Sequence, residues 1–379
     1  MRARPDFLAI GPGTAAGRLL RSFWQPVHLA ERLKAGRAVP LKILGQDFTL
    51  YRGEGGAPHL IGDRCAHRGV PLCAGRINGD VIECFYHGWT YDGAGQCVAQ
   101  PAEKRPFADK VRIGGYPTRE YLGLIFAYLG DGGAPEFPRF DAYARDGFIE
   151  AKESRRDWSY FSQLENSVDE VHFNFTHRQS KFTDVGLNDE IPELDCRETD
   201  YGILRLGRRG NRLRQSHIIM PNCMFSMVFE HWKGWSEHIA WRVPVDDGSH
   251  VSFMVDCIHK EGDAAEEYRR VRAEHRAGLK ALEPAASVID RILNGELHAD
   301  DVPYRPDIVL IQDGVALKGQ AARDREADLL GASDRQVSLL RRLWVREMEA
   351  IESGRPIKRW RAPPDLIPTT GTEDGSASA

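Results

Sequence analysis

The chain has 379 residues, of which 42% are hydrophobic and 28% charged, with a formal net charge of −4. This balance indicates a folded globular protein of two or so domains with substantial cores. It argues against nucleic acid or an anionic membrane as partner, and no apolar run approaches the roughly 20 residues of a membrane span.

The N-terminal segment, residues 1–39, is expected to be helical and to pack on the C-terminal domain. Gly11–Gly17 resembles a phosphate-binding loop, but its spacing is GxGxxxG and no strand precedes it. Thr14 is better interpreted as the N-cap of a short helix that runs toward Trp24. The extreme N-terminus lacks the apolar core of a signal peptide. The chain also has seven cysteines without a disulfide spacing, and together these features predict a cytoplasmic protein.

Residues 40–135 carry the signals of short β-strands. The stretch from Leu41 to Tyr51 predicts two strands joined by a tight turn. Further strands are expected at 58–62, 80–86, 110–116 and 121–129, separated by Gly, Pro and Asp. The region is therefore expected to be a small all-β domain.

Two metal-ligand pairs lie within this β region. Cys65 and His67 form C-x-H, and after a gap of sixteen residues Cys84 and His87 form C-x-x-H. A Rieske [2Fe–2S] cluster takes two cysteines on one iron and two histidines on the other. A structural zinc site is the alternative, but its usual spacing puts both cysteines in one arm, whereas here each arm is mixed. Trp89 follows directly and would shield the cluster, or simply pack in the core.

Beyond a linker at 130–138, residues 136–368 predict an α+β domain with an antiparallel sheet flanked by helices. A helix is expected from Ser159 to about Phe175. The C-terminal tail, residues 369–379, is expected to be disordered. Strands are expected near 202–206, 216–220, 223–230, 237–243 and 250–257, and further helices at 264–293 and 335–351, the last ended by Gly354 and Pro356.

A second metal motif lies in the expected helix as Asp169-x-x-His172-x-x-x-x-His177. Two imidazoles and one carboxylate on one face of an iron leave positions open for dioxygen and substrate. The histidines are five residues apart, roughly 500° on an ideal helix, so they cannot share one face. We therefore expect the helix to widen, as in a π-bulge, or to end between them. Taken alone, such a pair of histidines more often lies in a packed core or on the surface, but the cluster motif upstream favours iron.

With both motifs in this order, the chain resembles the oxygenase (α) subunits of Rieske non-haem iron oxygenases over nearly its whole length. It is most similar to the O-demethylase and phenoxybenzoate dioxygenase subgroup. The resemblance implies a third iron ligand on a downstream helix, here Asp313, although the preceding Gln312 stands where the family often has an acid. Asp307 and Asp301 are the reserves, and a helix N-cap is the alternative role for Asp313.

The resemblance also implies that Asp169 lies between a cluster histidine of one subunit and an iron histidine of the next, which requires a ring such as a homotrimer. A carboxylate in that position can accept hydrogen bonds from both imidazoles. Asn166 would lie near the iron without binding it tightly. Glu170 is interpreted as a surface or salt-bridge residue.

The implied function is the oxygenase component of a multicomponent system with a Rieske cluster and mononuclear Fe(II). Electrons would come from NAD(P)H through a separate reductase, with or without a ferredoxin, docking near the cluster histidines. Arg68, Lys104 and Arg105 would contribute, although a solvated charge run is the alternative for the last two. An electron carrier without oxygenase activity is the alternative from another class.

The expected substrate is an aromatic acid or ether that is O-demethylated or hydroxylated, with N-demethylation and alicyclic hydroxylation as alternatives. Two stretches could line the substrate pocket. The alternative for the first is ordinary core packing, and the alternative for the second is a polar loop. One is rich in Met and aromatic residues: Met220, Met224, Met227, Phe229, His231, Trp232 and Trp235. The other is basic and could anchor a carboxylate: Arg205, Arg208, Arg209, Arg212 and Arg214.

Overall fold

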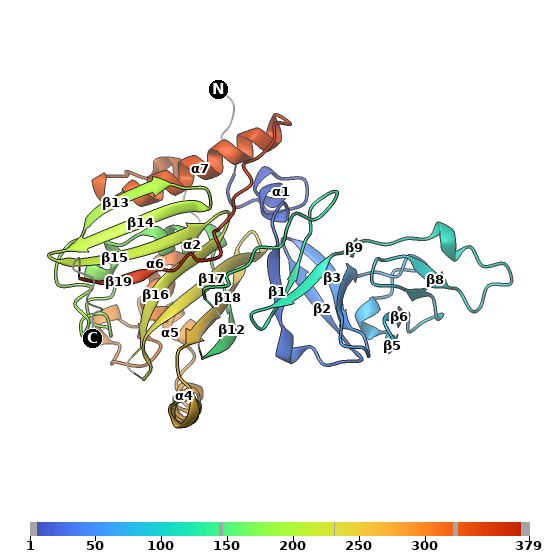
Figure 1. Cartoon of the computed structure of the whole chain (residues 1–379), viewed down its shortest axis with the longest axis horizontal. Coiled ribbons are helices and arrows are strands. Elements are labelled where there is room, and N and C mark those ends of the chain that lie inside the picture. Colours follow the sequence, from blue (N-terminus) through green and yellow to red (C-terminus); the bar gives the residue numbers. More distant parts are fainter. Residues whose placement is uncertain (1–5, 144–146, 231, 321–324, 373–379) are drawn as a thin grey trace.

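The computed structural model describes residues 6–143, 147–230, 232–320 and 325–372. The ribbon forms two lobes side by side, a smaller β lobe built from the first third of the chain and a larger lobe of sheet and helices (Figure 1). Helix α1 (Ala15–Arg21) lies between them and packs against α7 (Arg335–Glu352) of the larger lobe. In the described ranges, no helix combines the length and apolarity needed to cross a bilayer.

The smaller lobe is all β, as predicted for the first domain. Its three sheets have the orders β2-β3-β4-β9, β5-β6-β7-β8 and β1-β11-β10. The strands are β1 (Gln25–Leu29), β2 (Arg37–Ile43), β3 (Gln46–Arg52), β4 (Pro58–Gly62), β5 (Arg76–Asn78), β6 (Val81–Glu83), β7 (Thr90–Tyr91), β8 (Cys97–Ala99), β9 (Gly115–Tyr116), β10 (Thr118–Tyr121) and β11 (Leu124–Ala127). The predicted tight turn is the β2–β3 hairpin, where Leu44 and Gly45 have φ of 51° and 71°. Positive φ at both central residues is the hairpin geometry that matches strand twist.

The N-terminal segment differs from the expected helical unit. Thr14 caps α1 by accepting a hydrogen bond from the Gly17 amide, as predicted, but the helix already ends at Arg21. Strand β1 follows and pairs with β11, more than ninety residues later. Residues 25–29 therefore belong to the sheets of the smaller lobe, because their backbone hydrogen bonds are made there.

The larger lobe is organised around one antiparallel eight-stranded sheet, which confirms the predicted α+β class. Its order is β12 (Phe148–Arg156), β18 (Ser249–Ile258), β17 (Gly234–Asp246), β16 (Cys223–Glu230), β15 (Arg212–Ile219), β14 (Gly202–Arg209) and β13 (Glu193–Glu198). The eighth strand, β19 (Thr369–Thr372), pairs with β15. The expectation of a disordered tail is therefore wrong for these four residues, and residues 373–379 lie outside the described part.

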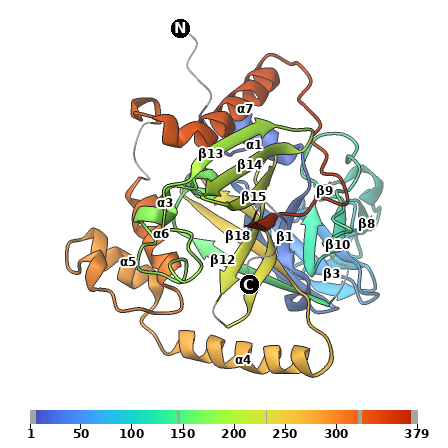
Figure 2. The ribbon, with the colours of Figure 1, turned by 60° about the vertical axis from the view of Figure 1, so that its left-hand side comes forward.

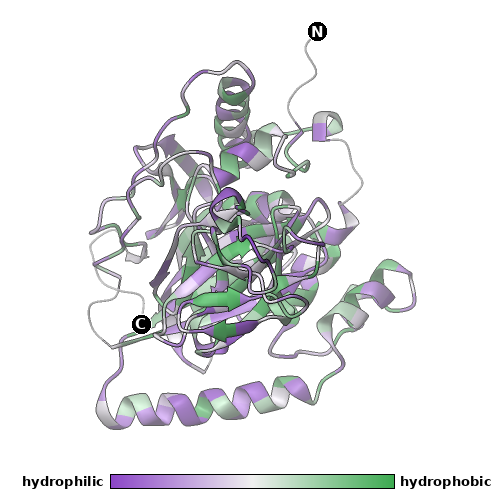
Figure 3. Ribbon diagram, turned by 90° about the vertical axis from the view of Figure 1, so that its right-hand side faces the viewer, coloured by the Kyte–Doolittle hydropathy of each residue, from purple (hydrophilic) through white to green (hydrophobic). Residues whose placement is uncertain are grey.

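The helices of this lobe gather mainly on one side of the sheet. They are α2 (Tyr160–Val168), α3 (His172–Phe175), α4 (Gly262–Lys280), α5 (Ala285–Leu293), α6 (Ile308–Gly319) and α7. Figure 2 shows α3, α5 and α6 together beside the strands, whereas α4 runs separately below them. The expected helix over 264–293 is two helices, because Pro284 separates α4 from α5 and cannot continue a helix. Most of α4 is hydrophilic (Figure 3), and only Ala265 and Tyr268 on it are buried.

Candidate metal centres and substrate cavity

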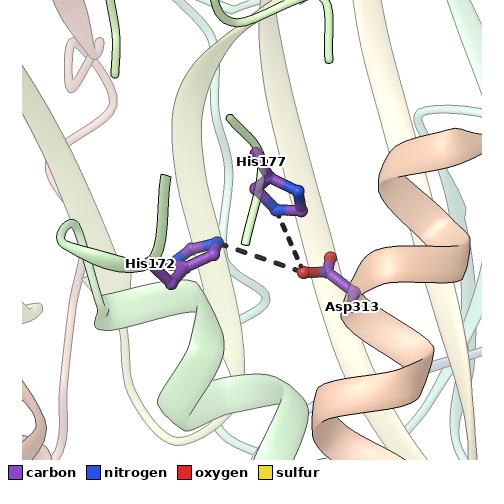
Figure 4. A group of neighbouring side chains, drawn as sticks. All are labelled: His172, His177 and Asp313. Carbon is purple, nitrogen blue, oxygen red and sulfur yellow. Dashed lines mark ion pairs between the residues drawn. The ribbon is translucent and has the colours of Figure 1, made fainter. Parts of the chain in front are cut away.

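His172, His177 and Asp313 converge on one point between α3 and α6 (Figure 4). The Asp313 Oδ1 atom lies 3.2 Å from His177 Nε2 and 4.0 Å from His172 Nε2. One ligand atom from each residue falls within 4.8 Å of the other two. Two imidazole nitrogens and a carboxylate oxygen at this spacing could hold one divalent metal and leave positions open, which fits a non-haem iron.

The local backbone explains how two histidines five residues apart come together. Helix α2 ends at Val168, and Asp169 has an extended backbone that breaks the expected single helix. The short helix α3 then begins at His172 and ends at Phe175, so His177 lies beyond its end. The predicted end of the helix between the two histidines is thus present, and residues 172–177 contain no π-helical turn.

Both imidazoles are oriented through their Nδ1 atoms. His172 Nδ1 lies 2.9 Å from the Asp169 carbonyl oxygen, and His177 Nδ1 lies 2.9 Å from Gln312 Oε1. A carbonyl oxygen only accepts, so each Nδ1 donates to its partner, and in the neutral ring each Nε2 is left with a lone pair that could bind a metal. Gln312 was only an imperfect motif match in the sequence; its role appears when α6 packs against His177.

The charges within this group reinforce one another. Burial acts to raise the pKa of Asp313, but His177 and His172 outweigh it and the pKa is lowered. Burial acts to lower the pKa of His177, yet Asp313 and Gln312 leave it raised. The pKa of His172 is lowered, first by burial and then by the neighbouring His177. Asn166 also donates from Nδ2 to Asp313 Oδ1 at 3.2 Å, so it lies at the site as expected.

The two reserve carboxylates are placed differently. Asp307 stands at the N-cap position of α6, and its oxygens pair with Arg305 at 2.6 and 3.0 Å. Asp301 lies in a separate exposed 3₁₀ turn. Asp313 is in the middle of α6, so the N-cap alternative does not apply to it.

The Asp169 carboxylate makes its hydrogen bonds with backbone amides of its own chain. Its Oδ1 accepts hydrogen bonds from the amides of Val171 at 2.8 Å and His172 at 3.3 Å. The ring of His172 is instead held by the Asp169 main-chain carbonyl. The Asp169 side chain is 30% exposed, and its Oδ2 lies 3.9 Å from His172 Nδ1.

Glu170 is not a surface residue, because its side chain is only 2% exposed. Its carboxylate pairs with Arg205, Arg209 and Arg214 at 2.8 to 3.0 Å. Burial acts to raise the pKa of Glu170, but these three arginines leave it lowered. All five arginines of the basic stretch lie on β14 and β15, not in a polar loop. Arg205, Arg209 and Arg214 already form ion pairs with Glu170.

The four residues of the cluster motif, Cys65, His67, Cys84 and His87, lie on two matching loops of the smaller lobe. Gly69 donates its amide to the Cys65 carbonyl at 2.9 Å, and Gly88 donates to the Cys84 carbonyl at 3.1 Å. Both glycines have φ near +70° and so close a tight turn around each cysteine. The His67 and His87 rings are half-buried, with centroids 4.6 Å apart.

The two cysteines are buried and all seven in the chain are free. Burial raises the pKa of the Cys84 thiol, and the adjacent Cys65 contributes to the rise. Adjacent buried thiols beside two accessible imidazoles fit a Rieske cluster. Trp89 stacks on the His67 ring at 4.7 Å, and Tyr91, which no motif indicated, lies 3.3 Å from Cys65 Sγ.

A cavity of about 430 Å³ lies against His172, His177 and Asp313. It runs between the sheet face and helices α2, α3 and α6. Of the Met- and aromatic-rich stretch, Met224, Met227 and Trp235 line it. Met220 instead belongs to the main core, Trp232 stacks on His275, and His231 lies outside the described residues.

Comparison with known proteins agrees with this architecture. Residues 23–120 match the family model described as the Rieske [2Fe-2S] domain. The chain is 29% identical over 368 residues to the 5,5'-dehydrodivanillate O-demethylase oxygenase subunit of Sphingobium sp., covering 91% of this chain and 79% of that protein. It is 26% identical to the phenoxybenzoate dioxygenase subunit alpha of Ectopseudomonas oleovorans, covering 92% and 86%.

Solved structures share the fold. NdmA of Pseudomonas putida, in a structure with theobromine, matches with a TM-score of 0.67 at 22% identity, covering 93% of this chain and 97% of that one. The oxygenase of carbazole 1,9a-dioxygenase, solved in complex with ferredoxin, matches with a TM-score of 0.63 at 21% identity, covering 91% and 96%.

The two-lobed fold, the matched Rieske domain and these relatives define the class. The chain belongs to the Rieske non-haem iron oxygenases. It is an oxygenase (α) subunit, an oxidoreductase whose cofactors are a Rieske cluster and a mononuclear iron.

Proposed function

We propose that His172, His177 and Asp313 hold the mononuclear iron and that Cys65, His67, Cys84 and His87 hold the cluster. The first assignment is supported by the convergence of two Nε2 atoms and one carboxylate oxygen, with each Nδ1 already bonded elsewhere. The second is supported by the paired loops around Cys65 and Cys84.

We infer that the reaction is O-demethylation of a methoxylated aromatic acid. The relative that is an O-demethylase aligns over 91% of this chain, and the cavity beside the triad has room for an aromatic ring. Hydroxylation of the methyl carbon gives a hemiacetal that releases formaldehyde. In balance, the ether, O₂, two electrons and two protons yield a phenol, formaldehyde and water. Ring hydroxylation is the second candidate, favoured by the phenoxybenzoate dioxygenase relative.

The iron would supply dioxygen activation, and the protein's part is to orient and enclose. Asp169 and Gln312 fix the two imidazoles, and Asn166 fixes the Asp313 carboxylate. Phe173 and Phe182 pack around the histidine rings and would limit water at the reacting carbon.

We also infer that electrons reach the cluster from NAD(P)H through a separate reductase, alone or with a ferredoxin. The ferredoxin complex of the carbazole oxygenase supports such a partner. Arg68 packs against the exposed Tyr86 ring next to His87 and would lie in this docking face. Seven free cysteines support the cytoplasm as the compartment.

The test is a reconstituted assay with NADH, a surrogate reductase and 3-methoxybenzoate, following oxygen uptake, formaldehyde and aromatic product. We expect formaldehyde and 3-hydroxybenzoate in equal amounts, and none from the Asp313→Ala variant, which would keep the visible absorbance of the cluster. A hydroxylated ring that retains its methoxy group would overturn O-demethylation in favour of ring attack. Cluster reduction without oxygen uptake for any substrate would favour a simple electron carrier.

A further inference from the structure

Six basic side chains line the cavity beside the iron site, and they fall into two groups. Four are paired with carboxylates. Lys181 bonds Glu230 at 2.5 Å, Lys152 bonds Asp256 at 2.9 Å, and Arg205 and Arg214 bond Glu170. The other two are Arg156 and Arg242. In the described part of the chain, no carboxylate oxygen lies within 4 Å of either guanidinium. These two arginines therefore differ from the other four basic side chains in having no ion-pair partner.

Arg242 is deeply buried, at 7% exposure, on β17. Its Nη1 donates to Ser252 Oγ at 2.9 Å, and its Nη2 reaches Ser167 Oγ at 3.5 Å. Both acceptors are neutral hydroxyls, and the buried Nε has no acceptor among the described residues. Burial, followed by the charge of Arg156, lowers the pKa of Arg242 to about 10, which still leaves it protonated.

Arg156 ends β12 and faces the same cavity. Its guanidinium lies 5.5 Å from the centre of the Trp158 ring, and its Nε is buried without an acceptor in the described residues. The residue itself is half-buried, because its side chain borders the open cavity. Both guanidiniums therefore line this cavity and feel each other's charge, and each has an Nε–H group without an acceptor among the described residues.

Two carboxylates among the described residues act on these arginines from a distance, Asp313 on both and Asp157 on Arg156, and the exposed Asp157 already pairs with Lys318. His250, opposite Arg156 in the β12–β18 register, is fully buried. Burial lowers the pKa of His250 to about 3, and both arginines lower it further, so the ring is neutral. Asp313 attracts both arginines from a distance, but its oxygens face the histidines and Asn166.

We propose that Arg156 and Arg242 form a carboxylate-binding subsite that anchors an aromatic acid in the cavity with its ring toward the His172–His177–Asp313 site. A buried charge without a partner is costly, and a guanidinium pair matches a planar carboxylate in geometry and charge. This assignment rests on the proposed function and specifies its substrate class. It also replaces the arginines held by Glu170 as candidate anchors.

The test compares two probes of nearly the same shape, 3-methoxybenzoate and 3-methoxybenzamide, by calorimetric titration of the anaerobic holoenzyme. We expect wild type to bind the acid at least about tenfold more tightly than the amide. Arg156→Met should lose this preference while its affinity for the amide stays unchanged. Arg155→Met is the matched control: the neighbouring side chain points to the other face of β12 and is exposed. It should keep the preference.

Equal binding of acid and amide by wild type would overturn the subsite, and this comparison decides the matter even where a variant does not fold. Retention of the preference by an Arg156→Met protein with full iron content would also overturn it. Formaldehyde release serves to separate the two proposals. Tight binding of the acid without formaldehyde release would support the carboxylate subsite and contradict O-demethylation. Formaldehyde release from a neutral methoxyarene but not from the acid would support O-demethylation and contradict the subsite.

Discussion

The ring orientation of each iron-site histidine depends on a single acceptor. His172 is held by a main-chain carbonyl, which no substitution removes, but His177 is held by the side chain of Gln312. Partners of this kind fix the tautomer and increase the basicity of the ligand nitrogen. Gln312 is therefore the residue at which the geometry of the site can be tested without touching a ligand.

We expect Gln312→Leu to weaken iron binding roughly 10- to 100-fold, because the His177 ring loses its Nδ1 acceptor. Competition with an iron chelator would measure the affinity, with cluster absorbance as an internal standard. Gln320→Leu, at the exposed C-cap of the same helix, should bind iron like wild type. An unchanged iron affinity in Gln312→Leu would show that Gln312 does not support iron binding through His177.

A second effect at the residue scale concerns buried neutral histidines. His217 is held by Tyr201 and the Ile367 carbonyl, and burial lowers its pKa to about 4. The unfolded chain takes up a proton below about pH 6.5 and the folded chain does not, so this contribution to stability is lost as pH falls from 6.5 toward 4.

Between pH 7 and pH 5 we expect His217 to account for a loss of about 2 kcal/mol in the free energy of unfolding. Urea titrations at the two pH values would measure it, and His217→Gln should show a shallower pH dependence by that amount. His298→Gln, at a side chain that is 73% exposed, should keep the wild-type slope. A His217→Gln protein with the wild-type slope would contradict the assignment.

At the scale of elements, the position of Asp313 depends on close packing of α6 against α5. A Cβ added at Gly314 would lie 2.2 Å from Ile289 Cδ1 and 3.3 Å from the Trp158 ring. These residues belong to a small separate core with Ile311 and Leu317. The glycine therefore lets α6 approach closely enough to present Asp313 to the histidines.

Gly314→Ala should destabilise the protein by roughly 1–3 kcal/mol through overpacking, despite the better helix propensity of alanine. It should also lower iron occupancy, since Asp313 is the adjacent residue. Thermal unfolding and iron analysis would measure both effects. In the same helix, Gly319→Ala meets only Leu293 at 3.7 Å and should be neutral or stabilising. Equal behaviour of the two variants would contradict this role for Gly314.

At the scale of the molecule, the cluster motif and the His172–His177–Asp313 group lie in separate lobes. The strands of the cluster region are at one end of Figure 1 and α6 is in the opposite lobe, where Figure 2 shows α3 beside it. Phe85 and Tyr86, beside His87, are exposed at 61% and 55%, and the Asp169 side chain in the other lobe is 30% exposed. These surfaces would complement each other in a ring of three chains.

We expect light scattering to give the mass of three 42.6-kDa chains, and iron analysis to give three irons per chain. Asp169→Asn keeps an acceptor for the Val171 amide but removes the charge. It should keep this assembly and slow reoxidation of the reduced cluster roughly 10- to 100-fold in single turnover. Asp263→Ala, in the first turn of α4, is the control. A monomer with normal turnover would contradict the model of electron transfer between subunits.

Much of this protein follows from local sequence. The cluster motif, the β signals around it, the cap at Thr14 and the end of α7 near Gly354 depend on spacing and backbone preference within a few residues. The break in the helix between His172 and His177 follows from the angle per residue. Such features are predictable because the atoms that determine them are neighbours along the chain.

Only the tertiary structure decided the rest. Gln312 meets His177 across 135 residues, Glu170 collects three arginines from two strands, and Arg156 and Arg242 share a cavity although 86 positions separate them. The sequence does not distinguish a charged side chain that is solvated from one that forms an ion pair or one that is buried in a cavity without a partner. Packing determines which of these holds, because burial sets the cost of an unpaired charge and the fold determines which partner is within reach.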